Sequence, residues 1–147
     1  MLQATVSFKG DVLKELERAK EEVASDITSV LITVGNAAVD ESPVWSGAYV
    51  RSFAWSANGA RKRRSYKSRQ DRVDEGAAKA TAKDQLYADL AVIEQIDLED
   101  LRSVMLTNGA QHASLVEAGT PSQPGGGIFA RVRDRLSTIG TVRRGRT

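Results

Sequence analysis

The chain has 147 residues, of which 41% are hydrophobic and 27% are charged, with a formal net charge of +2. This composition predicts one soluble domain with a core of its own. The absence of cysteine and the single histidine, His112, exclude disulfides, thiolate metal sites and metal sites with two histidines. No apolar run approaches the roughly 20 residues that cross a bilayer. The first ten residues lack a basic region followed by an apolar stretch, so no signal peptide is expected.

The small net charge conceals segments of opposite sign. Residues 1–60 hold 5 basic and 8 acidic side chains, whereas residues 61–72 hold 7 basic and 1 acidic. Residues 73–130 hold 3 basic and 9 acidic side chains, and residues 131–147 hold 6 basic and 1 acidic. Either the basic segments of one copy face acidic surfaces of another, or these segments are solvated loops and a frayed tail.

A strand and a long helix are predicted at the beginning of the chain. Residues 5–8 alternate polar and apolar side chains, which predicts a short strand or an extended lead-in. Residues 11–40 have apolar side chains at spacings of three and four, which predicts an amphipathic helix that Asp11 can cap. Gly35 indicates a kink or a close approach. Pro43 ends the helix, because the residue before a proline disfavours helical geometry.

A joint between this helix and a strand follows. Ser46 can cap a short turn of helix, and Gly47 allows a tight turn. Residues 51–56 then alternate as a strand that places Phe53 and Trp55 on one face. A strand laid across a long helix is the minimal core of an α+β domain.

The rest of the chain predicts further helices and one strand. A helix over residues 76–95 has Leu86, Leu90, Ile93 and Tyr87 on its buried side. A strand over 101–107, a short helix over 111–118 and a last helix from Ile128 that frays near Gly140 complete the elements. The predicted fold class is therefore α+β, with the long N-terminal helix packed on a small antiparallel sheet and with internal and C-terminal helices. We expect a single domain over residues 1–140 with a basic loop at 60–75, and a flexible basic tail at 141–147.

Two short blocks carry most of the functional information. The pattern residues of the first block are Pro43, Ser46, Gly47 and Ser52. Those of the second block are Asn108, His112, Glu117, Gly119, Pro124 and Gly125. In this order and spacing, and together with the predicted elements around them, the blocks resemble the signature of small neck and tail-completion proteins of tailed bacteriophages. The resemblance spans most of the chain.

The resemblance implies a structural virion protein whose copies form a ring at the head–tail junction after assembly in the host cytoplasm. The implied partners are other copies of the chain and the adjacent portal, adaptor, stopper, tail-tube or terminator rings. Non-specific contact with genomic DNA in the channel is also implied, and a membrane is not. Neither catalysis nor a cofactor or metal is implied. The loop at 61–72 is more basic than is usual in this family, and Gly125–Gly127 lengthen the segment before Ile128.

Individual residues of the blocks also have plain structural interpretations. His112 is expected to be a structural or surface residue. A buried Glu117 needs a partner, either an arginine or backbone N–H groups. No nucleophile, second carboxylate or metal cluster accompanies Glu117, so a general base is not expected there. Trp45 has the size to anchor the core or a contact between subunits.

The basic loop is the basis of the alternative function, a small basic protein that binds DNA without sequence specificity. The candidates for an interface or a DNA channel are Trp45, Arg61, Lys62, Arg63, Arg64, Lys67, Arg69 and Arg72. Their cations can bind phosphates, with one base stacked on Tyr66. The sequence has no helix-turn-helix, zinc finger or aromatic platform for reading bases. The same loop could instead be an arm that an adjacent ring orders.

Overall fold

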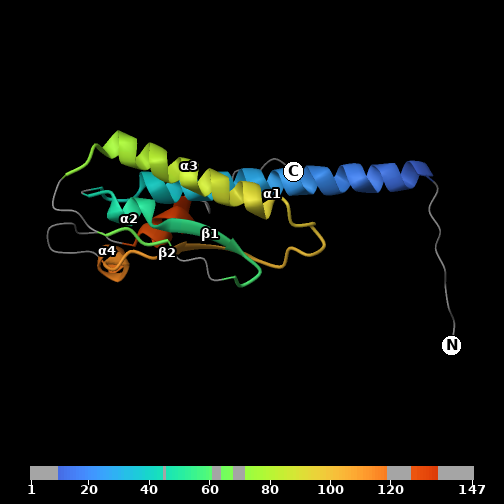
Figure 1. Cartoon of the computed structure of the whole chain (residues 1–147). Coiled ribbons are helices and arrows are strands. Elements are labelled where there is room, and N and C mark those ends of the chain that lie inside the picture. The colour runs from blue at the N-terminus through green and yellow to red at the C-terminus, as the bar shows by residue number, and fades with distance from the viewer. Residues whose placement is uncertain (1–9, 45, 61–63, 68–71, 119–126, 136–147) are drawn as a thin grey trace, which may run out of the picture.

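The structure is a computed structural model, and it describes residues 10–44, 46–60, 64–67, 72–118 and 127–135. The strand expected at residues 5–8 lies outside these ranges. The labelled elements are α1 (Gly10–Asp40), α2 (Ala48–Arg51), β1 (Phe53–Ala57), α3 (Glu75–Ile93), β2 (Val104–Asn108) and α4 (Ala113–Ala118). Residues 128–135 are also helical. This arrangement confirms the α+β fold class, with the long helix above a small antiparallel sheet (Figure 1).

The long helix α1 confirms the prediction for residues 11–40. It ends three residues before Pro43, as expected from the steric effect of a proline on the residue before it. The Ser42 hydroxyl donates to the Ala38 carbonyl over 2.6 Å, and the Ser42 amide donates to the Val39 carbonyl over 3.2 Å. These bonds satisfy two carbonyls of the last turn, which would otherwise have no partner within the helix.

Within the described residues, the sheet has two strands that are far apart in the sequence. β1 pairs antiparallel with β2, with Phe53 opposite Asn108 and Ala57 opposite Val104. Asn58 and Gly59 turn the chain away after β1 with positive φ angles of 54° and 74°. The predicted strand over 51–56 thus begins two residues late, because Arg51 still belongs to the short helix α2.

Helix α3 covers the sheet and packs beside α1 (Figure 1). Asp74 caps it, since its carboxylate accepts the Ala77 amide over 2.8 Å. Leu86, Leu90 and Ile93 are buried as predicted. Tyr87 was expected on the same buried side, but its side chain is 62% exposed. One residue along a helix turns the side chain by about 100°, which carries Tyr87 away from the core.

The core lies where α1, α2, α3 and β1 meet. Val39, Val50 and Phe53 are almost fully buried there, and Ile128 packs into the same cluster from the last helix. Gly35 marks a close approach, as expected, because a Cβ at this position would lie 3.3 Å from both Leu86 Cδ1 and Trp55 Nε1. A larger residue would separate α1 from the sheet and from α3.

The N-terminal half of α1 projects beyond this core (Figure 1). Its apolar spacing predicts a buried face, yet Leu16, Val23 and Val30 are 44–48% exposed. The prediction of a helix is correct, but within the described residues the core covers only the C-terminal half of its apolar face. None of the described helices is both long enough and apolar enough to span a membrane.

Candidate functional site

The two sequence blocks meet in one joint at the end of the sheet. The Gly109 amide donates to the Ser52 carbonyl over 3.1 Å, next to the Phe53–Asn108 pair. The Asn108 side chain donates to the Tyr49 carbonyl over 2.8 Å and accepts the Ala110 amide over 3.0 Å. Asn108 therefore connects β2 to α2, across 59 residues of sequence.

Ser52 connects the same joint to the basic loop. Its side chain is fully buried, and its hydroxyl donates to the Ala48 carbonyl and accepts the Tyr66 amide over 3.1 Å. A Cβ on Gly109 would lie 2.5 Å from the Arg64 carbonyl oxygen. The sequence predicts a turn at Asn108–Gly109. The structure shows that glycine is needed there because the backbones at Gly109 and Arg64 lie too close together for a side chain, at the end of β2.

The turn before α2 depends on Gly47 more than on Ser46. Gly47 is the N-cap residue of α2 and has a φ of 77°, which favours glycine. The Ser46 hydroxyl lies 3.4 Å from the Ala48 amide, a long contact that does not cap the helix. The expectation that Ser46 is the cap is therefore wrong by one residue. Pro43 is half-buried, and Trp45 lies outside the described residues.

Glu117 has the kind of partner that its sequence environment predicts. Its carboxylate accepts the Phe129 amide, with N–O distances of 3.1 and 3.4 Å. This amide belongs to the first turn of the helix at 128–135, where a negative charge is favourable. Glu117 thereby connects α4 to the last helix. Gly119, Pro124 and Gly125 lie outside the described residues.

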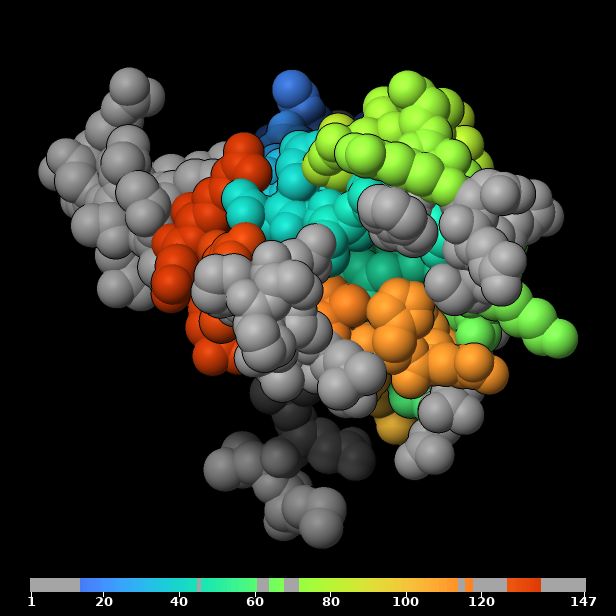
Figure 2. Space-filling model, turned by 90° about the vertical axis from the view of Figure 1, so that its left-hand side faces the viewer, coloured from blue at the N-terminus to red at the C-terminus, as the bar shows by residue number. Residues whose placement is uncertain are grey.

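Tyr49 lies between the two blocks. Burial of its ring, and after it the charge of Glu117, raise the pKa of Tyr49 well above the usual tyrosine range. The ring centroid of His112 lies 6.1 Å from that of Tyr49, and the half-buried imidazole packs at a tilt of 51°. This contact places His112 beside the joint. Figure 2 shows the end of the molecule where α4, the last helix and the start of α3 gather around it.

Arg64 is not a free cation of the basic loop. Its two Nη atoms donate to the two carboxylate oxygens of Asp89 over 3.0 and 2.9 Å, and Nη1 also donates to the Phe53 carbonyl over 2.7 Å. The Asp89 side chain is 2% exposed and also accepts the Trp55 amide over 3.1 Å. Arg64 was predicted to face a DNA channel or a subunit interface, and the structure places its guanidinium against Asp89 inside the domain, where its charge is neutralised.

The remaining residues of the basic loop divide into three groups. Lys67 and Arg72 are exposed, whereas Arg61, Lys62, Arg63 and Arg69 lie outside the described residues. Tyr66 is half-buried, with the Arg51 guanidinium 4.4 Å from its ring centroid and its hydroxyl accepting from Gln85 over 2.8 Å. One face of the Tyr66 ring is thus occupied by Arg51, which makes this ring a poor platform for stacking a base.

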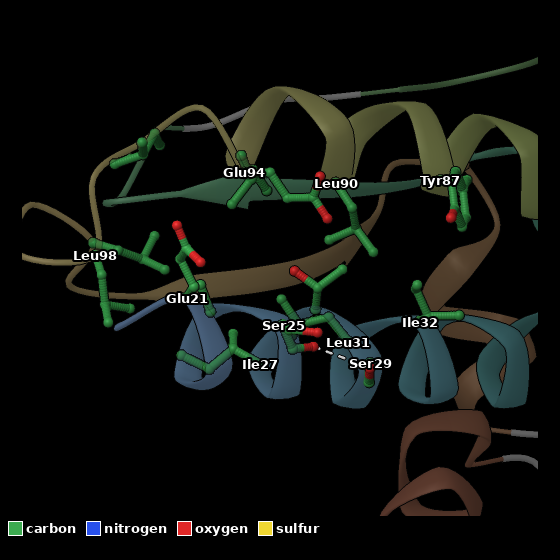
Figure 3. A pocket seen from close by; sticks show the side chains of 15 residues that line it. Glu21, Ser25, Ile27, Ser29, Leu31, Ile32, Tyr87, Leu90, Glu94 and Leu98 are labelled. Carbon is green, nitrogen blue, oxygen red and sulfur yellow. Dashed lines mark hydrogen bonds between the residues drawn. The ribbon is translucent and has the colours of Figure 1, made fainter. Parts of the chain in front are cut away.

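A groove between α1 and α3 is a surface feature that the sequence analysis missed. It has a volume of about 510 Å³, and Leu31, Ile32, Leu90, Ile93 and Leu98 supply much of its apolar lining (Figure 3). The Lys20 ammonium donates to Glu99 over 2.6 Å near one end and thereby holds the 94–103 segment against α1. This hydrogen bond raises the pKa of Lys20 and lowers that of Glu99. No pattern within one helix reveals such a groove, because α1 and α3 each contribute one wall.

The described residues hold no group of three histidine, aspartate or glutamate side chains placed to bind a metal ion. Comparisons of the chain with protein-family models, with curated proteins and with solved structures found no match.

Proposed function

We propose that this protein is a non-catalytic structural protein of a tailed bacteriophage, and that its copies form a ring at the head–tail junction. The supporting observation is the joint at Ser52, Asn108 and Gly109. It unites the two sequence blocks that resemble neck and tail-completion proteins. Phe53 and Asn108, which are 55 positions apart in the chain, pair there in a defined register, as parts of one structural unit would.

The hydrogen bonds of the pattern residues favour a structural role. Ser52, Asn108 and Glu117 each direct side-chain polar atoms at backbone groups of their own chain. Side chains used in this way fix the path of the backbone, and they position neighbouring elements. The pattern residues therefore stabilise the conformation of the subunit itself.

The exposed surface supports assembly with neighbouring subunits. Leu16, Val23 and Val30 recur every seven residues along α1, so they lie on one side of the helix. None of these three residues lines the groove between α1 and α3. Each copy thus presents two different apolar surfaces, and a ring with head-to-tail contacts needs two different surfaces on each subunit.

In this proposal the neighbours above and below the ring are the portal, adaptor or stopper on one side and the tail-tube or terminator proteins on the other. Lys67 is an exposed cation that can contact genomic DNA in the channel without reading its sequence. Repeated subunit contacts supply the stabilising free energy of such a ring.

Native mass spectrometry of the purified full-length chain tests the assembly part of this proposal. We expect a closed oligomer with one dominant copy number, together with duplex DNA binding that is weak at physiological salt. A monomer at all concentrations that binds any duplex tightly, and loses that affinity steeply as salt rises, would contradict the proposal and support the DNA-binding alternative.

A further inference from the structure

We propose that the groove between α1 and α3 binds residues 136–147 of a second copy of this chain. This inference deepens the proposed function, because it names one contact between adjacent subunits of the ring. The groove supplies the receptor surface of that contact, and the segment after the last described helix supplies the ligand.

The groove has an apolar floor and acidic walls. Leu31, Leu90 and Ile93 contribute to the floor. Figure 3 shows Glu21 on the α1 wall and Glu94 on the α3 wall. Of the described residues that line the groove, these two are the only charged ones. A segment that fits this surface combines apolar side chains with positive charge.

The surroundings of the groove extend its negative character. Asp97 and Asp100 are exposed in the segment that follows α3, and this segment closes one end of the groove. The nearby ammonium of Lys20 is paired with Glu99 over 2.6 Å, so that positive charge is already balanced. The acidic rim therefore favours a cationic occupant at ordinary ionic strength.

Residues 136–147 have the required composition. They contain Leu136, Ile139 and Val142 together with three arginines and no acidic residue. Residues 1–9 carry one lysine, and residues 61–72 carry many cations but no aliphatic side chain larger than alanine. Of the segments of this chain, residues 136–147 thus match both the floor and the rim best.

The position of the last helix favours a second copy as the source of this segment. Helix 128–135 lies below α1 while α3 lies above it (Figures 1 and 3). Arg131 lies 3.8 Å from Glu41, at the far end of α1 from the groove. To enter its own groove, the segment after residue 135 would have to cross α1 and run about 20 Å along it, which uses about half of the roughly 40 Å that its twelve residues span when extended. The groove of a neighbouring subunit does not impose this path.

A charge-reversal experiment with full-length chains tests the inference. One variant reverses the groove with Glu21→Lys and Glu94→Lys, and the other reverses the segment with Arg143→Glu, Arg144→Glu and Arg146→Glu. Sedimentation equilibrium of each variant alone is expected to show self-association weakened by about tenfold or more, because like charges then face each other. An equimolar mixture of the two variants is expected to restore association, since each acidic segment then meets a basic groove.

The matched control places the same two charge changes elsewhere, with Glu15→Lys on α1 and Asp84→Lys on α3. Both residues are exposed and neither lines the groove, so wild-type association is expected. Three results would overturn the inference. They are equal weakening by the control, failure of the mixture to associate, and a wild-type chain that stays monomeric at millimolar concentration. A ring that still forms on phage particles after such a result would leave the proposed function standing.

Discussion

Arg64 and Asp89 form a bidentate ion pair beside β1, with both Nη atoms of the arginine donating to the two carboxylate oxygens at 2.9–3.0 Å. The pair joins the basic loop to the C-terminal part of α3, and its hydrogen bonds to Phe53 and Trp55 also fix the first strand. Burying such a pair costs desolvation free energy. Removing one partner is strongly destabilising, because the remaining charge is then buried without a counter-ion.

Replacement of Asp89 is therefore expected to destabilise the fold. Asp89→Asn leaves the largely buried Arg64 guanidinium without a carboxylate, and the expected loss is about 3 kcal/mol in the free energy of unfolding. Asp84→Asn, at an exposed position on the same helix, is the control and should change stability by less than about 0.5 kcal/mol. Urea denaturation measures both values. Equal stability of the two variants would mean that the ion pair does not hold the loop.

Gly109 is expected to tolerate no side chain. Gly109→Ala places a Cβ 2.5 Å from the Arg64 carbonyl oxygen, and the displaced backbone should cost about 1–3 kcal/mol. Gly76→Ala is the control, because this glycine lies in the first turn of α3 with 3.4 Å to the nearest atom outside its own neighbours. Alanine favours a helix, so Gly76→Ala should leave stability unchanged or raise it by up to about 1 kcal/mol. Thermal unfolding followed by circular dichroism gives the comparison.

The side chain of Asn108 is expected to contribute more to the free energy of unfolding than an exposed amide side chain does. Asn108→Ala removes the partners of the Tyr49 carbonyl and the Ala110 amide, which are part-buried, and should cost about 1–3 kcal/mol. Gln111→Ala, three residues later and exposed, should stay within about 0.5 kcal/mol of the wild type. Hydrogen exchange of amides in β2 provides a local readout, with faster exchange predicted for the Asn108 variant alone. Unchanged exchange would contradict the role given to the joint.

The pH dependence of stability should reveal the burial of Tyr49. Its pKa is raised above the ordinary value of 10.0, first by burial and second by Glu117. The unfolded chain therefore loses this proton near pH 10 while the folded chain keeps it. The contribution of the neutral Tyr49 side chain to the stability of the fold is therefore complete below pH 10, and it declines as the pH rises further. Tyr49→Phe should reduce the alkaline loss of stability, and Tyr87→Phe, at a ring that is 62% exposed, should not. Urea midpoints on both sides of pH 10 would measure the difference.

The secondary structure could be predicted well from the sequence where a pattern is local. Apolar spacing and Pro43 gave α1 within one residue at its start, because these signals act within a few residues of each other. The start of β1 was predicted two residues too early. Alternation around residues 51–56 does not reveal that Arg51 completes a helical turn before the strand begins.

The site was less predictable, because its parts meet only in the fold. Arg64 belongs to a run of cations and Asp89 to a helix 25 residues away, so no local pattern links them. One signal was present, since Asp89 lies between Leu86 and Leu90 on the buried side of the predicted helix, and a charge there requires a partner. No sequence pattern predicted the groove, because each of its walls is an ordinary helix surface when taken alone.

Cryo-electron microscopy of purified virions that encode this chain tests the central claim most directly. The account predicts density for a closed ring at the head–tail junction, into which the described domain fits with α1 and the groove at contacts between adjacent copies. A ring in which α1 and the groove both face solvent would contradict the assigned interface. Absence of the protein from virions would contradict the structural function itself.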